Sequence, residues 1–209
     1  MNVFVLNTGR CGSTTFIRAC AHISNYSSAH ESRCALLGKA RLDYPSGHIE
    51  ADNRLSWFLG KLDERYGNDA FYVHLKRNPE ITAASYVKRY SAGIINAYRK
   101  AVLLYLPENS SPMAVAMDYC ETVDANIAFF LKDKTHKMDF HLENAKADFR
   151  KFWDFIGAEG NPQAALNEFE VSYNPSIDEN LAARAAAKLR RIWRQASQIG
   201  TAEISSPRG

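Results

Sequence analysis

A short glycine-containing turn near the start of the chain combines residue types that bind anions. The stretch Gly9–Thr14 reads Gly-Arg-Cys-Gly-Ser-Thr and follows a nearly continuous apolar run over residues 2–7. Glycines let the backbone approach a ligand closely, Arg10 adds a fixed positive charge, and Ser13 and Thr14 add hydroxyl donors. A strand that turns directly into a helix also presents the free N–H groups of the first helical turn. The pattern favours a phosphate- or sulfate-binding loop over an ordinary strand–helix turn with a surface arginine.

The same turn lacks the residues of two common nucleotide-binding motifs. The Walker motif needs a lysine directly after its last glycine, whereas Ser13 follows Gly12 in this chain. The dinucleotide pattern Gly-x-Gly-x-x-Gly is also missing from the turn. Both observations disfavour hydrolysis of ATP or GTP and the standard mode of dinucleotide binding.

A second segment offers another pair of anion-binding groups. The apolar run Ala70–Leu75 predicts a strand, and Asn78 followed by Pro79 predicts the start of a helix. Arg77, at the end of the strand, offers forked guanidinium donors to a phosphate. Ser85 lies about two turns into the helix, where its hydroxyl group can reach the same anion. A surface Arg77 and a buried helical Ser85 are the alternative to phosphate binding.

The rest of the chain predicts strands that alternate with helices. We expect further strands at about 27–30, 47–50 and 137–142, and helices at about 13–21, 52–66, 78 to beyond 98, 113–131, 149–157 and 178–197, with a loop over 160–178. This alternation implies an α/β fold with a mainly parallel central sheet. We expect a single domain over residues 1–209, with a helical insertion at about 86–134.

Composition narrows the class of protein. The 209 residues are 46% hydrophobic and 23% charged, as in ordinary soluble globular proteins. No run approaches the ~20 apolar residues of a membrane helix, and the N-terminus lacks the basic flank of a signal peptide. The four cysteines show no zinc-ligand spacing, which indicates a reducing compartment. A net charge of +3 suits one anionic ligand and does not indicate nucleic acid. We therefore expect a cytoplasmic protein without a membrane span.

The two anion-binding segments together resemble the nucleotide motifs of sulfotransferases that use 3′-phosphoadenosine-5′-phosphosulfate (PAPS). Those enzymes place a basic residue, a small residue, glycine and two hydroxyl residues in the phosphosulfate loop, which assigns that role here to Gly9, Arg10, Cys11, Gly12, Ser13 and Thr14. Their 3′-phosphate motif is a strand ending in Arg-Asn-Pro with a serine eight positions after the arginine, here Arg77 and Ser85. The local similarity is greatest to tyrosylprotein and carbohydrate sulfotransferases.

The resemblance implies a fold and an activity. The fold would be P-loop-like, with three α/β/α layers and a helical lobe on the acceptor side. The activity would be in-line transfer of a sulfuryl group from PAPS to an acceptor hydroxyl, without a metal and with 3′-phosphoadenosine 5′-phosphate (PAP) as the product. Carbohydrates, glycolipids and tyrosine, whether small molecules or peptides, are the acceptor classes, and the oligomeric state is open. A P-loop-type small-molecule kinase and a non-catalytic nucleotide-binding module are the alternatives.

Two residues compete for the role of general base, a role that typically contributes ~10²–10⁴-fold to a rate. Glu31 begins a Glu-Ser-Arg stretch that is similar to the Glu-Thr-Arg stretch of tyrosylprotein sulfotransferases. That similarity implies Glu31 as the base and Arg33 as a contact to substrate or donor. His48 is the rival, because cytosolic sulfotransferases of phenols and steroids use a histidine after the third strand. Arg10 is the further catalytic candidate, and Cys11 at a helix N-terminus is either a small residue that fits the loop or a thiol of lowered pKa.

Overall fold

The central strand β1 (Asn2–Asn7) is buried along its whole length and supplies two separate cores. Val3 and Val5 belong to the core on one face of the sheet, and Phe4 and Leu6 to the core on the other. Successive side chains of a strand point to opposite faces, so a continuous apolar run is what a strand covered on both sides requires. The computed structural model, which describes residues 1–171, thus confirms the first predicted strand.

Five parallel strands form the sheet, in the order β2-β3-β1-β4-β5. Their bounds are Ser27–His30 for β2, His48–Ala51 for β3, Ala70–Lys76 for β4 and Lys137–His141 for β5. The chain passes from β1 toward one edge of the sheet and from β4 toward the other. The crevice between the carboxyl ends of β1 and β4 is therefore a topological switch point, where open α/β sheets bind ligands. The predicted α/β fold with a parallel sheet is confirmed.

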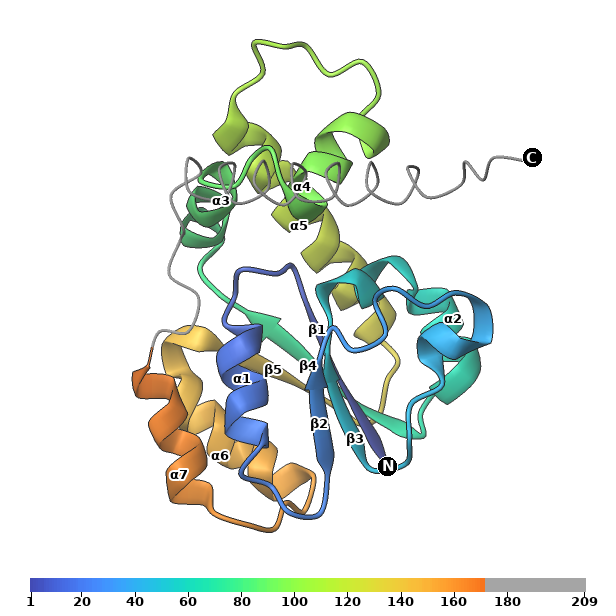
Figure 1. The fold of residues 1–209 in the computed structure, drawn as a ribbon, viewed down its shortest axis with the longest axis vertical. Helices are drawn as coiled ribbons and strands as arrows, with labels where there is room; N and C mark the ends of the chain where they lie inside the picture. The colour runs from blue at the N-terminus through green and yellow to red at the C-terminus, as the bar shows by residue number, and fades with distance from the viewer. Residues whose placement is uncertain (172–209) are drawn as a thin grey trace, which may run out of the picture. The chain divides into compact units, whose positions relative to one another are not determined.

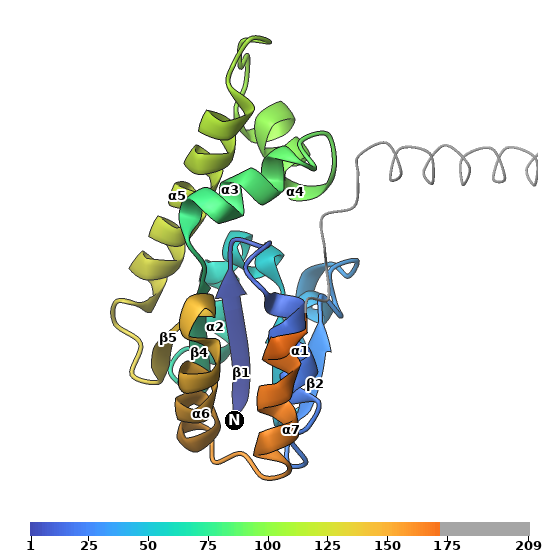
Figure 2. The ribbon, with the colours of Figure 1, turned by 90° about the vertical axis from the view of Figure 1, so that its left-hand side faces the viewer.

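Helices cover both faces of this sheet (Figure 1). The first face is covered by α1 (Ser13–Cys20), α6 (Ala145–Phe155) and α7 (Pro162–Asn167). The second is covered by α2 (Leu59–Tyr66) and α5 (Pro112–Leu131). Figure 2 shows α3 (Pro79–Val87), α4 (Gly93–Ala97) and one end of α5 beyond the carboxyl ends of the strands. This helical lobe lies above the switch point.

The predicted long helix from residue 78 to beyond 98 is wrong. Asn78 caps α3 as expected, but α3 ends at Val87, and α4 begins only at Gly93 and continues as one π-helical turn, Tyr98–Val102. Gly93 has a φ of +62°, a left-handed conformation that glycine adopts without strain. The chain therefore turns after α3 instead of continuing as a straight helix.

Two other expected segments differ from the structure. The predicted helix at 52–66 is divided into a 3₁₀ segment, Asn53–Trp57, and α2. The expected loop at 160–178 contains α7, which has Pro162 at its first position and is capped by Asn161. The Asn-Pro pair that suggested a loop is in fact a helix start. The predicted helix at 178–197 lies outside the described residues.

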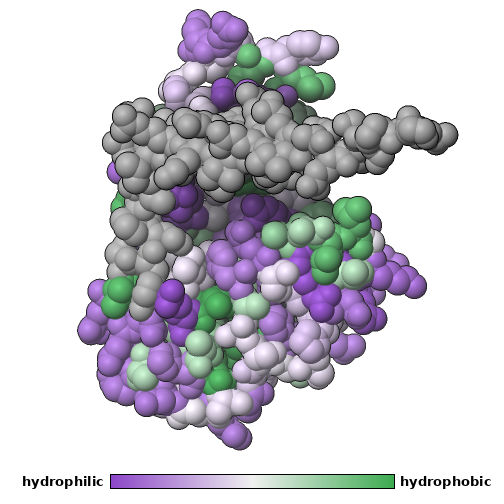
Figure 3. All heavy atoms as spheres, in the orientation of Figure 1, coloured by the Kyte–Doolittle hydropathy of each residue, from purple (hydrophilic) through white to green (hydrophobic). Residues whose placement is uncertain are grey.

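Within residues 1–171, no helix is both long and apolar enough to cross a membrane. The face in Figure 3 is mainly hydrophilic over the α/β body, with apolar residues on the side where Figure 1 draws the segment between β2 and α2 and also in smaller patches near the middle of the body. That segment includes the exposed Leu36 and Leu37.

Candidate active site

The turn after β1 has the backbone conformation of an anion-binding loop. Gly9, Arg10 and Gly12 all have positive φ angles, of 82°, 59° and 89°. A Cβ atom on Gly9 would lie 2.3 Å from the Tyr86 hydroxyl oxygen, and one on Gly12 would lie 2.7 Å from Leu142 Cδ1. Gly9 is therefore required by space as well as by conformation, and Gly12 by its conformation. Turns built from such conformations make concave anion sites of successive N–H groups.

Side chains beneath the loop fix its shape. Asn7 Oδ1 accepts the Gly9 N–H at 2.8 Å. The hydroxyl groups of Tyr86, on α3, and Tyr119, on α5, both donate to the Thr8 carbonyl, at 2.5 and 2.8 Å. Burial raises the pKa of Tyr86 well above its ordinary value, so this hydroxyl remains a donor. Hydrogen bonds thus connect this turn to α3 and α5 of the lobe above it.

Cys11 packs into the core and is not an activated thiol. Its side chain is fully buried, with Sγ 3.4 Å from Asn7 Oδ1. Burial raises the pKa of the thiol to about 12, which outweighs the effect of the helix N-terminus. The hypothesis of a lowered thiol pKa is therefore wrong, and the structure favours Cys11 as a small residue that fits the loop.

The two predicted anion-binding segments meet at the switch point. Arg10 Nε donates to Ser85 Oγ at 3.0 Å, and Arg77 Nη1 donates to the Arg10 carbonyl at 3.1 Å. Burial lowers the pKa of Arg10, and the positive charges of Arg89 and Arg77 lower it further. Three guanidinium groups therefore lie near one another in a partly buried place. An anion bound between them would relieve their mutual repulsion.

These groups line a cavity of about 540 Å³ at the carboxyl edge of the sheet. Four of its lining residues are arginines, Arg10, Arg54, Arg77 and Arg89, and the predicted binding residues Gly9, Gly12, Ser13 and Thr14 line it as well. Two buried atoms on its wall, Arg89 Nε and Asn53 Oδ1, have no hydrogen-bond partner within the described part of the chain. Buried polar atoms are nearly always bonded, so such atoms are suited to contact a polar ligand.

Glu31 also lines this cavity. It follows β2 directly, has a φ of +52°, and its side chain is 32% exposed. Its Oε2 lies 2.7 Å from Arg54 Nη1. Burial by itself lowers the pKa of Arg54, but the bond to Glu31 outweighs this and raises it. The structure therefore places a carboxylate beside the arginine cluster, as a base for an acceptor hydroxyl would require.

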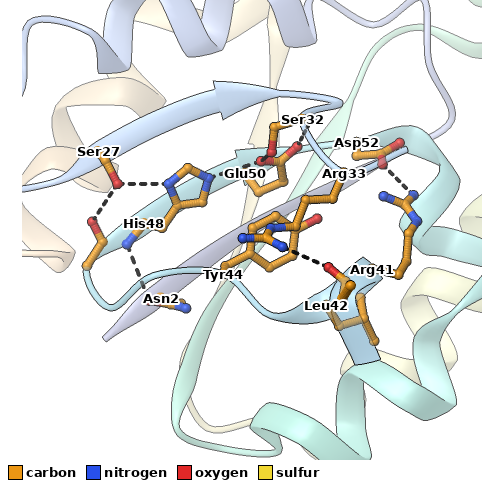
Figure 4. A network of polar contacts seen from close by, with 12 residues as sticks. Asn2, Ser27, Ser32, Arg33, Arg41, Leu42, Tyr44, His48, Glu50 and Asp52 are labelled. Atoms are coloured by element: carbon orange, nitrogen blue, oxygen red, sulfur yellow. Dashed lines mark hydrogen bonds and ion pairs between the residues drawn. The ribbon is translucent and has the colours of Figure 1, made fainter. Parts of the chain in front are cut away.

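His48 and Arg33 are not among the residues that line the cavity. His48 is 6% exposed, with Nε2 3.0 Å from Glu50 Oε2 and Nδ1 2.8 Å from Ser27 Oγ. The Arg33 guanidinium lies over the Tyr44 ring, 5.2 Å from its centre (Figure 4). Of the three predicted residues, Glu31 lines the cavity, whereas His48 and Arg33 do not.

Sequence reasoning missed several residues of the site. Asn53 and Arg54 follow the carboxyl end of β3, a position that by itself points to a ligand edge. His30 Nε2 lies 3.0 Å from the Ser13 hydroxyl, and its place at the end of β2 gives the same signal. Arg89 lies in the turn after α3, and no local pattern points to it.

Comparisons with known proteins agree with this geometry. No protein-family model matches the chain, and no curated protein sequence is significantly similar to it. Among solved structures, it is similar to the sulfotransferase domain from the curacin biosynthetic pathway, with 15% identity and a TM-score of 0.57 over 84% of this chain and 80% of that one. It is also similar to mouse sulfotransferase SULT7A1 complexed with PAP, with 16% identity and a TM-score of 0.50 over 77% of this chain and 59% of that one. The chain therefore has a sulfotransferase-like α/β fold.

Proposed function

We propose that this chain is a PAPS-dependent sulfotransferase, which moves a sulfuryl group to an acceptor hydroxyl. The observation that carries the proposal is the contact between the two anion-binding segments. Arg10 Nε bonds Ser85 Oγ, and Arg77 bonds the Arg10 carbonyl, and both arginines line a cavity with Arg54 and Arg89. The likeness in fold to a sulfotransferase solved with PAP supports the same donor.

The cavity has anion-binding groups from two segments of the chain, and we assign one anionic end of the donor to each. In this proposal the N–H groups that follow Gly9 and the hydroxyls of Ser13 and Thr14 bind the phosphosulfate, and Arg77 and Ser85 bind the 3′-phosphate. Arg89 Nε and Asn53 Oδ1 supply a donor and an acceptor for further polar groups of the nucleotide. The donor itself supplies the activated sulfuryl group.

The residues of the chain align and stabilise the transfer. Glu31 accepts the proton of the acceptor hydroxyl as that oxygen bonds to sulfur, and the bond between sulfur and the 5′-phosphate oxygen breaks. Arg10 and the loop N–H groups stabilise the charge that develops on the departing phosphate. Arg54 holds the Glu31 carboxylate toward the cavity. The products are a sulfate ester, PAP and a proton on Glu31, which later passes to water.

We also propose a carbohydrate, glycolipid or tyrosine hydroxyl as the acceptor and the cytoplasm as the place of action. Glu31 is preferred to His48 as the base because Glu31 lines the cavity, whereas His48 is buried against Glu50.

Binding of nucleotides tests the donor. Calorimetry with PAP should show binding at least about tenfold tighter than ATP with magnesium, a difference of about 1.4 kcal/mol. A kinase would give the reverse order, and tighter binding of ATP would overturn the proposal.

Turnover tests the chemistry. Transfer of labelled sulfate from PAPS is measured over a panel of 4-nitrophenol, a tyrosine peptide, N-acetylglucosamine and a galactosyl glycolipid. With the best acceptor, Glu31→Gln should lower kcat by ~10²–10⁴-fold while PAP affinity is unchanged. Glu64→Gln, an exposed glutamate on α2, is the control. A near-normal kcat in Glu31→Gln would remove Glu31 as the base, and binding of PAP without any transfer would indicate a non-catalytic module.

A further inference from the structure

Strand β3 and the residue that follows it carry a row of three buried polar residues. His48, Glu50 and Asp52 are 6%, 0% and 0% exposed, and they alternate with Ile49 and Ala51, which pack in the core of the opposite face. We call these three residues the β3 polar row. Charged side chains are seldom fully buried unless they are paired, so each of them requires partners. None of the three lines the cavity.

Glu50 uses its carboxylate to hold the residue that follows Glu31. Its Oε1 accepts the Ser32 N–H at 2.7 Å, and its Oε2 accepts the Ser32 hydroxyl at 2.6 Å (Figure 4). His48 Nε2 lies 3.0 Å from the same Oε2. Two bonds from one carboxylate to one serine fix both the position and the rotation of the peptide after Glu31. They hold Glu31 in the left-handed conformation that a residue with a side chain rarely adopts.

Asp52 holds the side-chain carboxylate of Glu31 indirectly, through Arg54. Its Oδ1 accepts the Arg54 N–H at 2.8 Å, and its Oδ2 accepts Arg41 Nη2 at 2.5 Å. Arg54 in turn contacts Glu31 Oε2 at 2.7 Å. The backbone of Glu31 is thus held through Glu50, and its carboxylate is held through Arg54, which Asp52 anchors.

We propose that Glu50 and Asp52 are positioning residues for Glu31, with His48 and Arg41 as their supports. The proposal rests on the proposed function, in which Glu31 is the base. It gives the buried His48 a role behind the site, in place of a direct role in proton transfer. Displacement of a reacting group by about 1 Å can lower a rate by ~10²-fold, so residues that never touch the substrate can control turnover.

The principal test is the kinetics of Glu50→Gln, which keeps the size of the side chain and removes its charge. We expect kcat for the best acceptor to fall by about 10- to 100-fold. The KM for that acceptor and the Kd for PAP should stay within about twofold. The double variant Glu31→Gln/Glu50→Gln should be no slower than Glu31→Gln alone, because a positioning residue acts only through the group it positions.

A matched control is Asp148→Asn. Asp148 is also a buried carboxylate that accepts a backbone N–H, from His141 at 2.9 Å, but it lies on α6 near β5, at the other edge of the sheet. Asp148→Asn should lower stability without lowering kcat. If Glu50→Gln does not fold, Ser32→Ala removes one bond to Glu50 from an exposed residue and should lower kcat about 3- to 10-fold.

Amide hydrogen exchange gives a readout that needs no turnover. Residues 31–34 should exchange faster in Glu50→Gln than in the wild type, and should be unchanged in Asp148→Asn. Unchanged exchange at residues 31–34 overturns the proposal even if the wild type transfers no sulfuryl group. Two kinetic results would overturn the positioning role when the wild type is active and Glu31→Gln is not. One is a normal kcat in Glu50→Gln, and the other is a double variant in which the kcat losses of the two single variants multiply. Both results leave the proposed function standing.

Discussion

The two walls of the cavity are built in different ways. The donor wall consists of Gly9–Thr14 and Arg77, and all of these residues except the buried Cys11 line the cavity. The base wall consists of Glu31 and Arg54, and behind it lie the buried carboxylates of the β3 polar row. An anion is bound by any set of donors with the right curvature and charge. A base must also be oriented, so the base wall depends on residues that the ligand never touches.

The largest effect on nucleotide binding should come from the donor wall, where Gly9→Ala forces a clash as well as a strained φ. Its new methyl group would lie 2.3 Å from the Tyr86 hydroxyl oxygen. We expect a loss of about 3 kcal/mol in PAP binding, roughly 100-fold, measured by calorimetry. Gly60→Ala, with open space around its Cβ position, is the control and should bind PAP normally. Normal binding by Gly9→Ala would mean that the loop can move, and the donor wall would not be preformed.

Arg77→Met should separate the two ends of the donor. We expect PAP affinity to fall about 10- to 100-fold, while adenosine 5′-phosphosulfate, which lacks the 3′-phosphate, loses no more than about twofold. Arg65→Met removes an exposed arginine paired with Asp43 and should change neither affinity. Equal losses for both nucleotides would place Arg77 at the phosphosulfate end and would contradict the assignment.

Cys11 tests whether the donor wall uses a thiol for packing or for chemistry. The pKa of its thiol is raised by burial from an ordinary 9.0 to about 12. Between these values the unfolded chain releases the proton and the folded chain keeps it, so rising pH favours unfolding. Cys11→Ala should reduce the alkaline slope of the free energy of unfolding by about 1.4 kcal/mol per pH unit, measured by urea titration. An unchanged slope would show an ionised thiol in the folded protein. Cys34→Ala, at an exposed cysteine, is the control.

The smallest effect should come from Tyr119→Phe, which removes one of the two hydroxyl groups that bond the Thr8 carbonyl. Tyr86 still donates to that oxygen. We expect a loss of about 1 kcal/mol in stability and a change of about twofold or less in PAP affinity. The double variant Tyr86→Phe/Tyr119→Phe leaves the buried carbonyl unbonded and should lose more than the sum of the single variants. If the stability losses of the two single variants simply add in the double variant, water replaces the hydroxyl groups at the Thr8 carbonyl.

The donor wall could be predicted from the sequence because its signals are local. The turn Gly9–Thr14 follows its strand directly, and the spacing of Arg77 and Ser85 lies within one strand–helix unit. The parallel sheet then brings the two segments together, since neighbouring strands end at the same edge. The meeting of the two segments could therefore be predicted from the alternation of strands and helices alone.

The base wall could be predicted only in part. Glu31 could be predicted from its resemblance to the Glu-Thr-Arg stretch of tyrosylprotein sulfotransferases, and Arg54 has a signal in its place after β3. No local pattern points to Arg89, which also lines the cavity. The alternation from His48 to Asp52 is visible in the sequence, yet it equally fits a strand with one face in water. The burial of His48, Glu50 and Asp52 and the packing of Tyr44 against His48 show that this face is covered. His48 was a candidate base by resemblance to cytosolic sulfotransferases, and the structure instead buries it against Glu50.

The central place of β1 has a consequence during protein synthesis. This strand is made before both of its neighbours, and the second of them, β4, ends at Lys76. At about 5–20 residues per second, the ribosome needs roughly 3–14 s to pass from the end of β1 to the end of β4. For that time the apolar strand has at least one edge without a partner, which is a template for aggregation. Until β4 is made, the nascent chain therefore carries an incompletely paired apolar strand that will lie at the centre of the finished sheet.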